Sequence, residues 1–274
     1  MEVVMHDTLS VNPSDSLNSL KEASKKITML SVPDFYSARL VDQLGVDCIL
    51  IGDSLGKTLQ GDRDVFSVSI GDILYYTKIV RKAVSKGIII SDMPYSSYEL
   101  GKEEAVKNAN YLIENGGANA VKLEGGRDYF DIIKALVKAK VPVMGHLGLK
   151  DSFYSKQGGN PMLSDQKTSD WDRILKQAKE LEKIGIFALM LECVPAELGR
   201  LVSESLKIPV IGQGAGQYVD GQCLIFHDMM GFHEGFKPKF IKPYGRLSEV
   251  MGQAVKDFVE DVNGLVFPSE EHEY

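Results

Sequence analysis

Short apolar runs alternate with stretches of helical period along most of this chain. Eight runs rich in branched apolar residues recur, at Ile27–Ser31, Cys48–Gly52, Ile88–Ser91, Ala120–Leu123, Val141–Gly145, Ala188–Leu191, Val210–Gly212 and Cys223–Phe226. Most are continuously apolar rather than alternating, which is typical of parallel strands buried on both faces. The pattern therefore predicts eight strands of a parallel sheet.

Amphipathic stretches separate these runs. Helices are predicted over Lys102–Glu114, Asp128–Lys138 and Trp171–Ile184, with an extra helix over Ser14–Lys26 before the first strand. Alternation of strands and helices predicts βαβ units with right-handed crossovers. Eight strands favour an α/β fold of the closed (β/α)₈ TIM-barrel type over an open doubly wound sheet, and no linker divides the chain. We therefore expect one barrel domain over residues 1–274.

Two segments stand apart from this alternation, and the first of them has no clear period. Phe153–Ser169 is rich in Gly, Ser, Asp and Lys and predicts a long loop, of the kind that serves as a functional lid or is disordered. The tail Pro268–Tyr274 is acidic and is expected to be peripheral.

Composition excludes several classes of protein. The chain of 274 residues has a net charge of -7, which argues against a nucleic-acid surface because phosphate binding needs clustered Lys and Arg. Its three cysteines form no disulfide framework, so a reducing, cytoplasmic setting is expected. No apolar run approaches the ~20 residues that a membrane-spanning helix requires.

Polar side chains stand where the apolar runs end. These residues are Asp53 and Ser54, Asp92, Lys122 and Glu124, His146, Glu192 and Gln213. In a parallel barrel these ends meet at one mouth, where active sites are built. Clustered carboxylates repel one another, so a cation is expected among them, and an oxygen-only set favours Mg²⁺ or Mn²⁺ over Zn²⁺. Lys122 shares the parity of Glu124 and suits an anionic group of a substrate.

Each residue also has an ordinary structural interpretation. An isolated Asp after a strand is often a helix N-cap, and Asp92 before Pro94 could serve a turn. The glycine clusters could form plain turns or cradle a phosphate. Lys122 could simply neutralise Glu124, a lone His146 is more often structural than catalytic, and Cys193 is expected to be inert. The conjunction of four acids and a lysine at separate strand ends favours the functional interpretation.

Taken together, the strand-end segments resemble the ketopantoate hydroxymethyltransferase family. The matching segments begin at Gly52-Asp-Ser-Leu-Gly, Asp92-Met-Pro, Val121-Lys-Leu-Glu-Gly-Gly, Gly145-His-Leu-Gly-Leu, Leu191-Glu-Cys-Val-Pro, Gly214-Ala-Gly, Asp220-Gly-Gln, His227-Asp and Pro238-Lys-Phe. They keep the family's order and span roughly residues 27–271. The resemblance implies a barrel of the phosphoenolpyruvate/pyruvate superfamily and a homo-oligomer, often decameric.

The resemblance also implies chemistry and roles. It implies Mg²⁺, a 2-oxo acid substrate, and 5,10-methylenetetrahydrofolate as donor of the one-carbon unit that turns 3-methyl-2-oxobutanoate into ketopantoate in pantothenate synthesis. Asp53 and Asp92 match metal ligands that also contact substrate, and Glu124 matches a further carboxylate of the metal site. The family's substrate contacts are matched by Ser54 and Lys122, and its proton acceptor by Glu192.

The chain departs from the family pattern at several points. Pro33 stands where Tyr is usual, Tyr76 where His is usual, and Gln213 interrupts a usual Gly-Ile-Gly-Ala-Gly. The family's glycine-rich loop after Leu149 is replaced by Gly158-Gly-Asn-Pro-Met-Leu-Ser. This leaves two alternatives to the family reaction: a divergent aldolase or C–C lyase on another 2-oxo acid, or a catalytically silent barrel. The retained acids and Lys122 argue against the silent barrel.

Overall fold

The computed structural model describes residues 12–148, 168–232 and 238–274. By contacts, the chain divides into two compact units, Met1–Leu224 and Ile225–Tyr274. No helix within the described ranges combines the length and apolar character that crossing a membrane requires. The predicted loop Phe153–Ser169 lies almost wholly outside the described residues.

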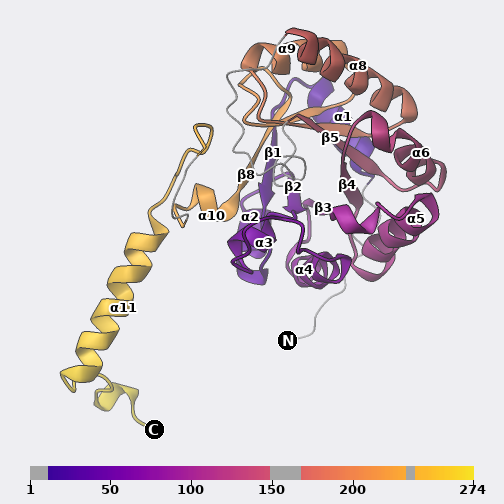
Figure 1. Cartoon of the computed structure of the whole chain (residues 1–274). Helices are drawn as coiled ribbons and strands as arrows, with labels where there is room; N and C mark the ends of the chain where they lie inside the picture. The colour runs from indigo at the N-terminus through magenta and orange to yellow at the C-terminus, as the bar shows by residue number, and fades with distance from the viewer. Residues whose placement is uncertain (1–11, 149–167, 233–237) are drawn as a thin grey trace. The chain divides into compact units, whose positions relative to one another are not determined.

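Eight parallel strands close into a barrel in the order β1 to β8 (Figure 1). Their bounds are β1 Ile27–Ser31, β2 Cys48–Ile51, β3 Ile88–Asp92, β4 Ala120–Glu124, β5 Val143–Gly148, β6 Ala188–Glu192, β7 Val210–Gln213 and β8 Gly221–Ile225. All eight predicted strands are present, and the predicted (β/α)₈ architecture is confirmed.

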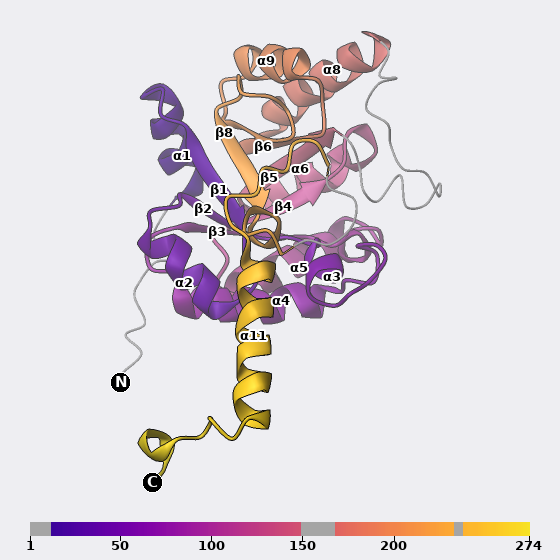
Figure 2. The ribbon, with the colours of Figure 1, turned by 90° about the vertical axis from the view of Figure 1, so that its left-hand side faces the viewer.

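Helices surround the barrel strands (Figures 1 and 2). In the first unit they are α1 Pro13–Glu22, α2 Phe35–Gln43, α3 Leu55–Thr58, α4 Ile70–Ala83, α5 Lys102–Asn110, α6 Phe130–Lys138, α8 Thr168–Ile184 and α9 Ala196–Ser205. Shorter turns are η2 Tyr95–Ser97, η3 Tyr111–Asn115 and η4 Arg127–Tyr129. The second unit contains α10 Phe226–Met229, α11 Leu247–Asn263 and η6 Glu270–His272.

Several boundaries differ from the predicted ones for identifiable reasons. The fifth strand begins at Val143 rather than Val141, because the Val141 N–H bonds back to Leu136 at the end of α6 and Pro142 has no N–H to donate. The extra N-terminal helix ends at Glu22, two residues before Ser24 takes a left-handed φ of 53°. Phe226 begins α10 instead of ending β8.

The barrel interior is filled by every second residue of the strands. Ile88 and Ile90 of β3 and Ile211 of β7 belong to one buried core cluster. Leu17 of α1 joins this cluster with no exposed surface, which confirms the N-terminal helix and gives it a packing role. Because side chains alternate faces along a strand, the inward parity that buries these residues continues to the carboxyl ends of the strands.

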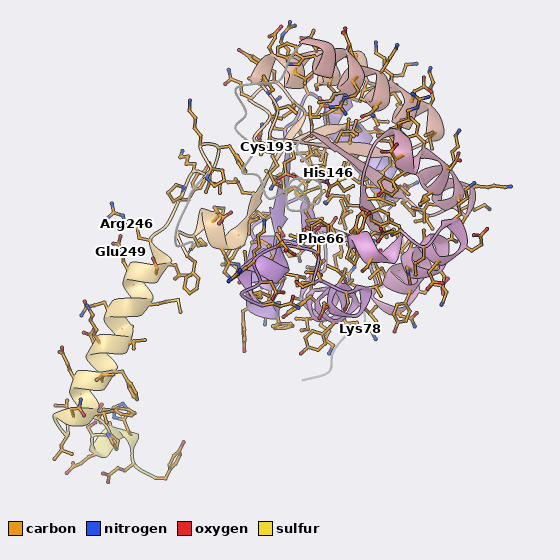
Figure 3. The ribbon with its side chains drawn as sticks, viewed as in Figure 1. Phe66, Lys78, His146, Cys193, Arg246 and Glu249 are labelled. Atoms are coloured by element: carbon orange, nitrogen blue, oxygen red, sulfur yellow. The ribbon has the colours of Figure 1, made fainter. Side chains whose placement is uncertain are left out.

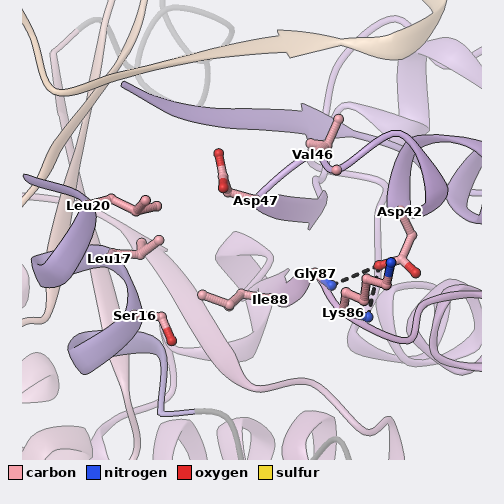
Figure 4. Close-up of a pocket in the computed structure, with 10 residues that line it drawn as sticks. Ser16, Leu17, Leu20, Asp42, Val46, Asp47, Lys86, Gly87 and Ile88 are labelled. Atoms are coloured by element: carbon pink, nitrogen blue, oxygen red, sulfur yellow. Dashed lines mark hydrogen bonds between the residues drawn. The ribbon is translucent and has the colours of Figure 1, made fainter. Parts of the chain in front are cut away.

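A pocket of about 210 Å³ lies at the other, amino end of the strands (Figure 4). It is lined by α1 and by the residues that precede β2 and β3. Asp42 of α2 borders it, is only 2% exposed, and accepts hydrogen bonds from the Ser85 N–H and hydroxyl and from the Lys86 and Gly87 N–H groups. This carboxylate therefore fastens the turn that leads into β3.

Asp42→Asn is expected to lower the free energy of unfolding by about 1–3 kcal/mol at neutral pH. The asparagine NH₂ group would be a second donor facing the backbone N–H groups that now donate to the carboxylate. Burial works to raise the pKa of Asp42, but hydrogen bonds from Gly87, Ser85 and Lys86 lower it below the ordinary 3.8. A depressed pKa contributes stability above 3.8 that is lost as the pH falls through the folded-state value. In urea unfolding, the difference in unfolding free energy between wild type and Asp42→Asn should therefore shrink as the pH falls below 3.8. A difference that stays constant in that range would contradict this assignment.

Candidate active site

The carboxyl end of the barrel gathers most of the polar residues singled out from the sequence. By strand parity, Asp92 follows the core residue Ile90, Glu192 follows Met190, and Gln213 follows Ile211, so all three face inward. Lys122 and Glu124 share the inward parity of Ala120 on β4. His146 stands in register with Glu124 on one side and with Met190 on the other.

Asp92 and Lys122 form a buried ion pair. The Lys122 Nζ lies 2.6 Å from Asp92 Oδ1, and the two side chains are 6% and 5% exposed. Asp92 Oδ2 accepts the Asp53 N–H at 3.0 Å, which fixes the turn after β2 against β3. Burial opposes the charge on Lys122, but attraction to Asp92, Asp53 and Glu124 raises its pKa above the ordinary value. Lys122 thus stays a cation among three carboxylates.

Gly52 lets the turn after β2 approach β3 closely. A Cβ at Gly52 would lie 3.1 Å from the hydroxyl oxygens of Ser31 and Ser54 and 3.5 Å from Asp92 Oδ2. The close approach puts the Ser54 hydroxyl on the same side of the turn as Asp92. It also brings in Ser31 of β1, which the sequence analysis did not single out although it ends the first strand.

The capping alternative does not describe the site acids. The N-cap positions of the helices that follow them are Ser54, Pro94 and Gly126. A capping Asp does occur, but it is Asp34, whose carboxylate accepts the Ser37 N–H. The alternative that Lys122 pairs only with Glu124 is also not what the structure shows, because its direct partner is Asp92.

His146 connects the ion pair to Glu192. Its Nδ1 lies 3.5 Å from Lys122 Nζ, and its Nε2 lies 2.9 Å from Glu192 Oε2. An ammonium can only donate, so Nδ1 is the accepting nitrogen and Nε2 carries the ring proton, in close polar contact with Glu192. His146 is labelled within the barrel in Figure 3, as is Cys193, the residue after Glu192 in the sequence. His146 is therefore part of the candidate site rather than an isolated structural histidine. Its inward parity, which it shares with Lys122 on the neighbouring strand, is the feature of the sequence that could have indicated this.

An aromatic wall borders Glu124. Tyr98 is 2% exposed and donates its hydroxyl to the Glu124 carbonyl at 3.1 Å. Its ring packs edge-on against Tyr129 and Tyr95, with centroids 5.1 and 5.8 Å away. Burial above all, and then the Glu124 charge, raises the pKa of Tyr98, so its phenol stays neutral. Nothing in the sequence marked Tyr98, because it lies on a short turn after β3 rather than at a strand end.

Three carboxylates of the site offer oxygen donors to a divalent cation. Asp53, Asp92 and Glu124 supply carboxylate oxygens and all three act electrostatically on Lys122, so negative charge exceeds the single ammonium. Hard oxygen donors of this kind suit Mg²⁺. In the ranges that the structure describes, no three His, Cys, Asp or Glu side chains already form a group that could hold a metal. The chemistry of the donors fits, and ligation by these three residues stays a prediction.

Comparisons with solved structures agree with the fold. A 2,3-dimethylmalate lyase, a member of the PEP mutase/isocitrate lyase superfamily, superposes with a TM-score of 0.63 at 14% identity over 96% of this chain and 91% of its own. A phosphoenolpyruvate phosphomutase from Streptomyces platensis subsp. rosaceus gives a TM-score of 0.60 at 14% identity, over 95% and 91% of the two chains. These similarities support the barrel fold.

Comparisons with known sequences are more specific. The 3-methyl-2-oxobutanoate hydroxymethyltransferase of Thermoanaerobacter sp. (strain X514) is 42% identical over 259 residues, 94% of either chain. That of Clostridium botulinum (strain Alaska E43 / Type E3) is 41% identical over 96% of this chain and 95% of its own. The family model described as ketopantoate hydroxymethyltransferase matches residues 13–270. The chain belongs to the ketopantoate hydroxymethyltransferase family.

Proposed function

We propose that this enzyme transfers a hydroxymethyl group to 3-methyl-2-oxobutanoate and so forms ketopantoate for pantothenate synthesis. Relatives that align with 94–96% of this chain at 41–42% identity are 3-methyl-2-oxobutanoate hydroxymethyltransferases, which makes the chain a hydroxymethyltransferase. The observation that carries the proposal is the inward-facing set of Asp92, Lys122 and Glu192 at one end of the barrel. Such a set can bind an anionic 2-oxo acid and remove a proton from it.

The residues that would hold Mg²⁺ are Asp53, Asp92 and Glu124. When bound, the ion would act as a Lewis acid that stabilises negative charge on the keto oxygen of the substrate. The fit rests on the excess of carboxylates around Lys122. Asp53 and Asp92 are already joined by the 3.0 Å bond between backbone and carboxylate, which holds the two strand ends together.

Lys122 and Ser54 would position the 2-oxo acid. Lys122 remains an ammonium because three carboxylates act on it, so it can pair with the substrate carboxylate. Its contact with Asp92, 2.6 Å away, holds the ammonium beside the last residue of β3. The hydroxyl of Ser54, which the close approach at Gly52 places beside Asp92, offers a donor to the same end of the substrate.

Glu192 would take the C3 proton. Its side chain is 19% exposed, so bulk water reaches it only in part. His146 Nε2 lies 2.9 Å from one carboxylate oxygen of Glu192, which leaves the other oxygen to accept the proton. The enolate that results would attack the carbon carried by 5,10-methylenetetrahydrofolate; the folate supplies the carbon and the protein supplies orientation. Residues 149–167, which include most of the altered loop, lie outside the described ranges.

We also propose a cytoplasmic homo-oligomer, with a decamer among the possible assemblies. The cysteines Cys48, Cys193 and Cys223 are buried and form no disulfide bond, which fits a reducing compartment. Within the second unit, α11 has no buried residue, and its exposed apolar side chains include Val250, Met251, Val255 and Phe258. Exposed apolar side chains along one helix favour burial of that helix in an assembly.

To test this proposal, the purified protein is incubated with Mg²⁺, 3-methyl-2-oxobutanoate and 5,10-methylenetetrahydrofolate, and the formation of ketopantoate is measured. Product that disappears on adding a chelator supports the proposal. A folded enzyme that exchanges the C3 proton of the 2-oxo acid in D₂O yet makes no ketopantoate would point to the aldolase or lyase alternative. Absence of both exchange and product would contradict the shared enolate chemistry.

A further inference from the structure

Gln213 is the polar residue of β7, and it departs from the Gly-Ile-Gly-Ala-Gly pattern that this segment otherwise resembles. It ends β7 and shares the inward parity of the fully buried Ile211. The register of β6 and β7 sets Gln213 directly beside Glu192. An isoleucine there would present only methyl groups to the carboxylate, whereas glutamine presents an amide.

The Gln213 amide contacts the proposed base. Its Nε2 donates to Glu192 Oε1 at 3.4 Å, at the long end for a hydrogen bond. The other carboxylate oxygen, Oε2, faces His146 Nε2 at 2.9 Å. The carboxylate is therefore held from both neighbouring strands, by β5 through His146 and by β7 through Gln213.

The backbone around Glu192 is also fixed from both sides. Cys193 adopts a left-handed φ of 50°, uncommon for a residue with a side chain, and donates its N–H to the Gln213 carbonyl at 2.9 Å. On the β5 side, a Cβ at Gly148 would lie 2.0 Å from the Glu192 carbonyl oxygen, so only glycine permits this approach. With the main chain fixed, the remaining freedom of the base lies in its side-chain torsions.

We infer that Gln213 is a positioning residue for Glu192, a role that rests on the proposed function of Glu192 as base. The terminal torsion of a glutamate is broad, so a carboxylate held at one oxygen still rotates. The Gln213 hydrogen bond at Oε1, added to the close His146 contact at Oε2, limits that rotation and keeps the plane of the carboxylate toward the C3 proton of the 2-oxo acid. Orientation of a reacting group contributes directly to the rate, without a change in how tightly substrate binds.

The experiment measures C3 proton exchange of 3-methyl-2-oxobutanoate in D₂O with Mg²⁺ and without folate, over a range of substrate concentrations. Gln213→Met keeps the length of the side chain and removes the donor, and Gln213→Ile restores the residue usual in the family. The matched control is Gln222→Met on β8, an exposed glutamine whose amide donates to the Gly216 carbonyl. Thermal unfolding of each variant is followed in parallel.

Gln213→Met is expected to lower the saturated exchange rate about three- to tenfold, with half-saturating substrate concentration and unfolding temperature near those of Gln222→Met. Gln213→Ile should fall in the same range. If wild type exchanges and Gln213→Met matches it, Gln213 only fills space and the inference is wrong. A rise in half-saturating concentration alone would also overturn it, because that would make Gln213 a substrate contact. Absence of exchange in wild type would instead contradict the proposed function itself.

Discussion

Exchange of the C3 proton is expected to fall by about 10²–10⁴-fold in Glu192→Gln, the largest effect of any single change at this site. An amide keeps the shape of the side chain but cannot accept the proton. It also turns a donor toward either the His146 Nε2–H or the Gln213 amide, which lie at the two oxygens of Glu192. Exchange would be followed by NMR in D₂O with Mg²⁺.

The matched control for this change is Glu197→Gln. Glu197 lies five residues further along, on the exposed face of α9, where it pairs with Arg200. That variant should exchange at the wild-type rate. Binding of 3-methyl-2-oxobutanoate to Glu192→Gln, measured by calorimetry, should stay within a few-fold of wild type, since the substrate carboxylate is assigned to Lys122. Substantial exchange in folded Glu192→Gln would transfer the role of base to another residue.

The sequence was sufficient for the fold because apolar runs and helical periods are local signals. All eight strands were predicted, and the same alternation of faces that fills the barrel with Ile90 and Met190 sends Asp92 and Glu192 to its mouth. The start of β5 falls two residues later than predicted, because Pro142 has no N–H to donate to a neighbouring strand. Family and fold could therefore be predicted from periodicity and motif order.

The pairing of side chains could not be predicted in the same way. Parity says which face a residue occupies, but partners depend on the register between strands that are far apart in sequence. Lys122 pairs with Asp92, which stands opposite it in the β3–β4 register, rather than with Glu124 on its own strand. His146 and Gln213 gain their roles only because β5 and β7 flank β6. Their positions were noted in the sequence, and their contacts with Glu192 were not foreseeable.

Lys122→Met is expected to lower the free energy of unfolding by about 3–5 kcal/mol in the presence of a chelator. The change leaves the Asp92 carboxylate, only 5% exposed, without the ammonium that lies 2.6 Å from it. The bond from the Asp53 N–H remains but does not balance the charge. Urea unfolding provides the measurement. Lys102→Met is the control, because Lys102 pairs with Asp131 at an exposed 3.8 Å contact expected to contribute only about 0–1 kcal/mol.

A double variant separates the structural from the functional part of this effect. Adding Asp92→Asn to Lys122→Met removes the uncompensated charge, so most of the lost stability should return. Proton exchange should not return, because the double variant lacks both the cation for the substrate carboxylate and a carboxylate proposed to hold Mg²⁺. If Lys122→Met destabilised the protein no more than Lys102→Met, the buried pair would carry little of the stability of this barrel mouth. Exchange in the double variant at the wild-type rate would remove both residues from the proposed mechanism.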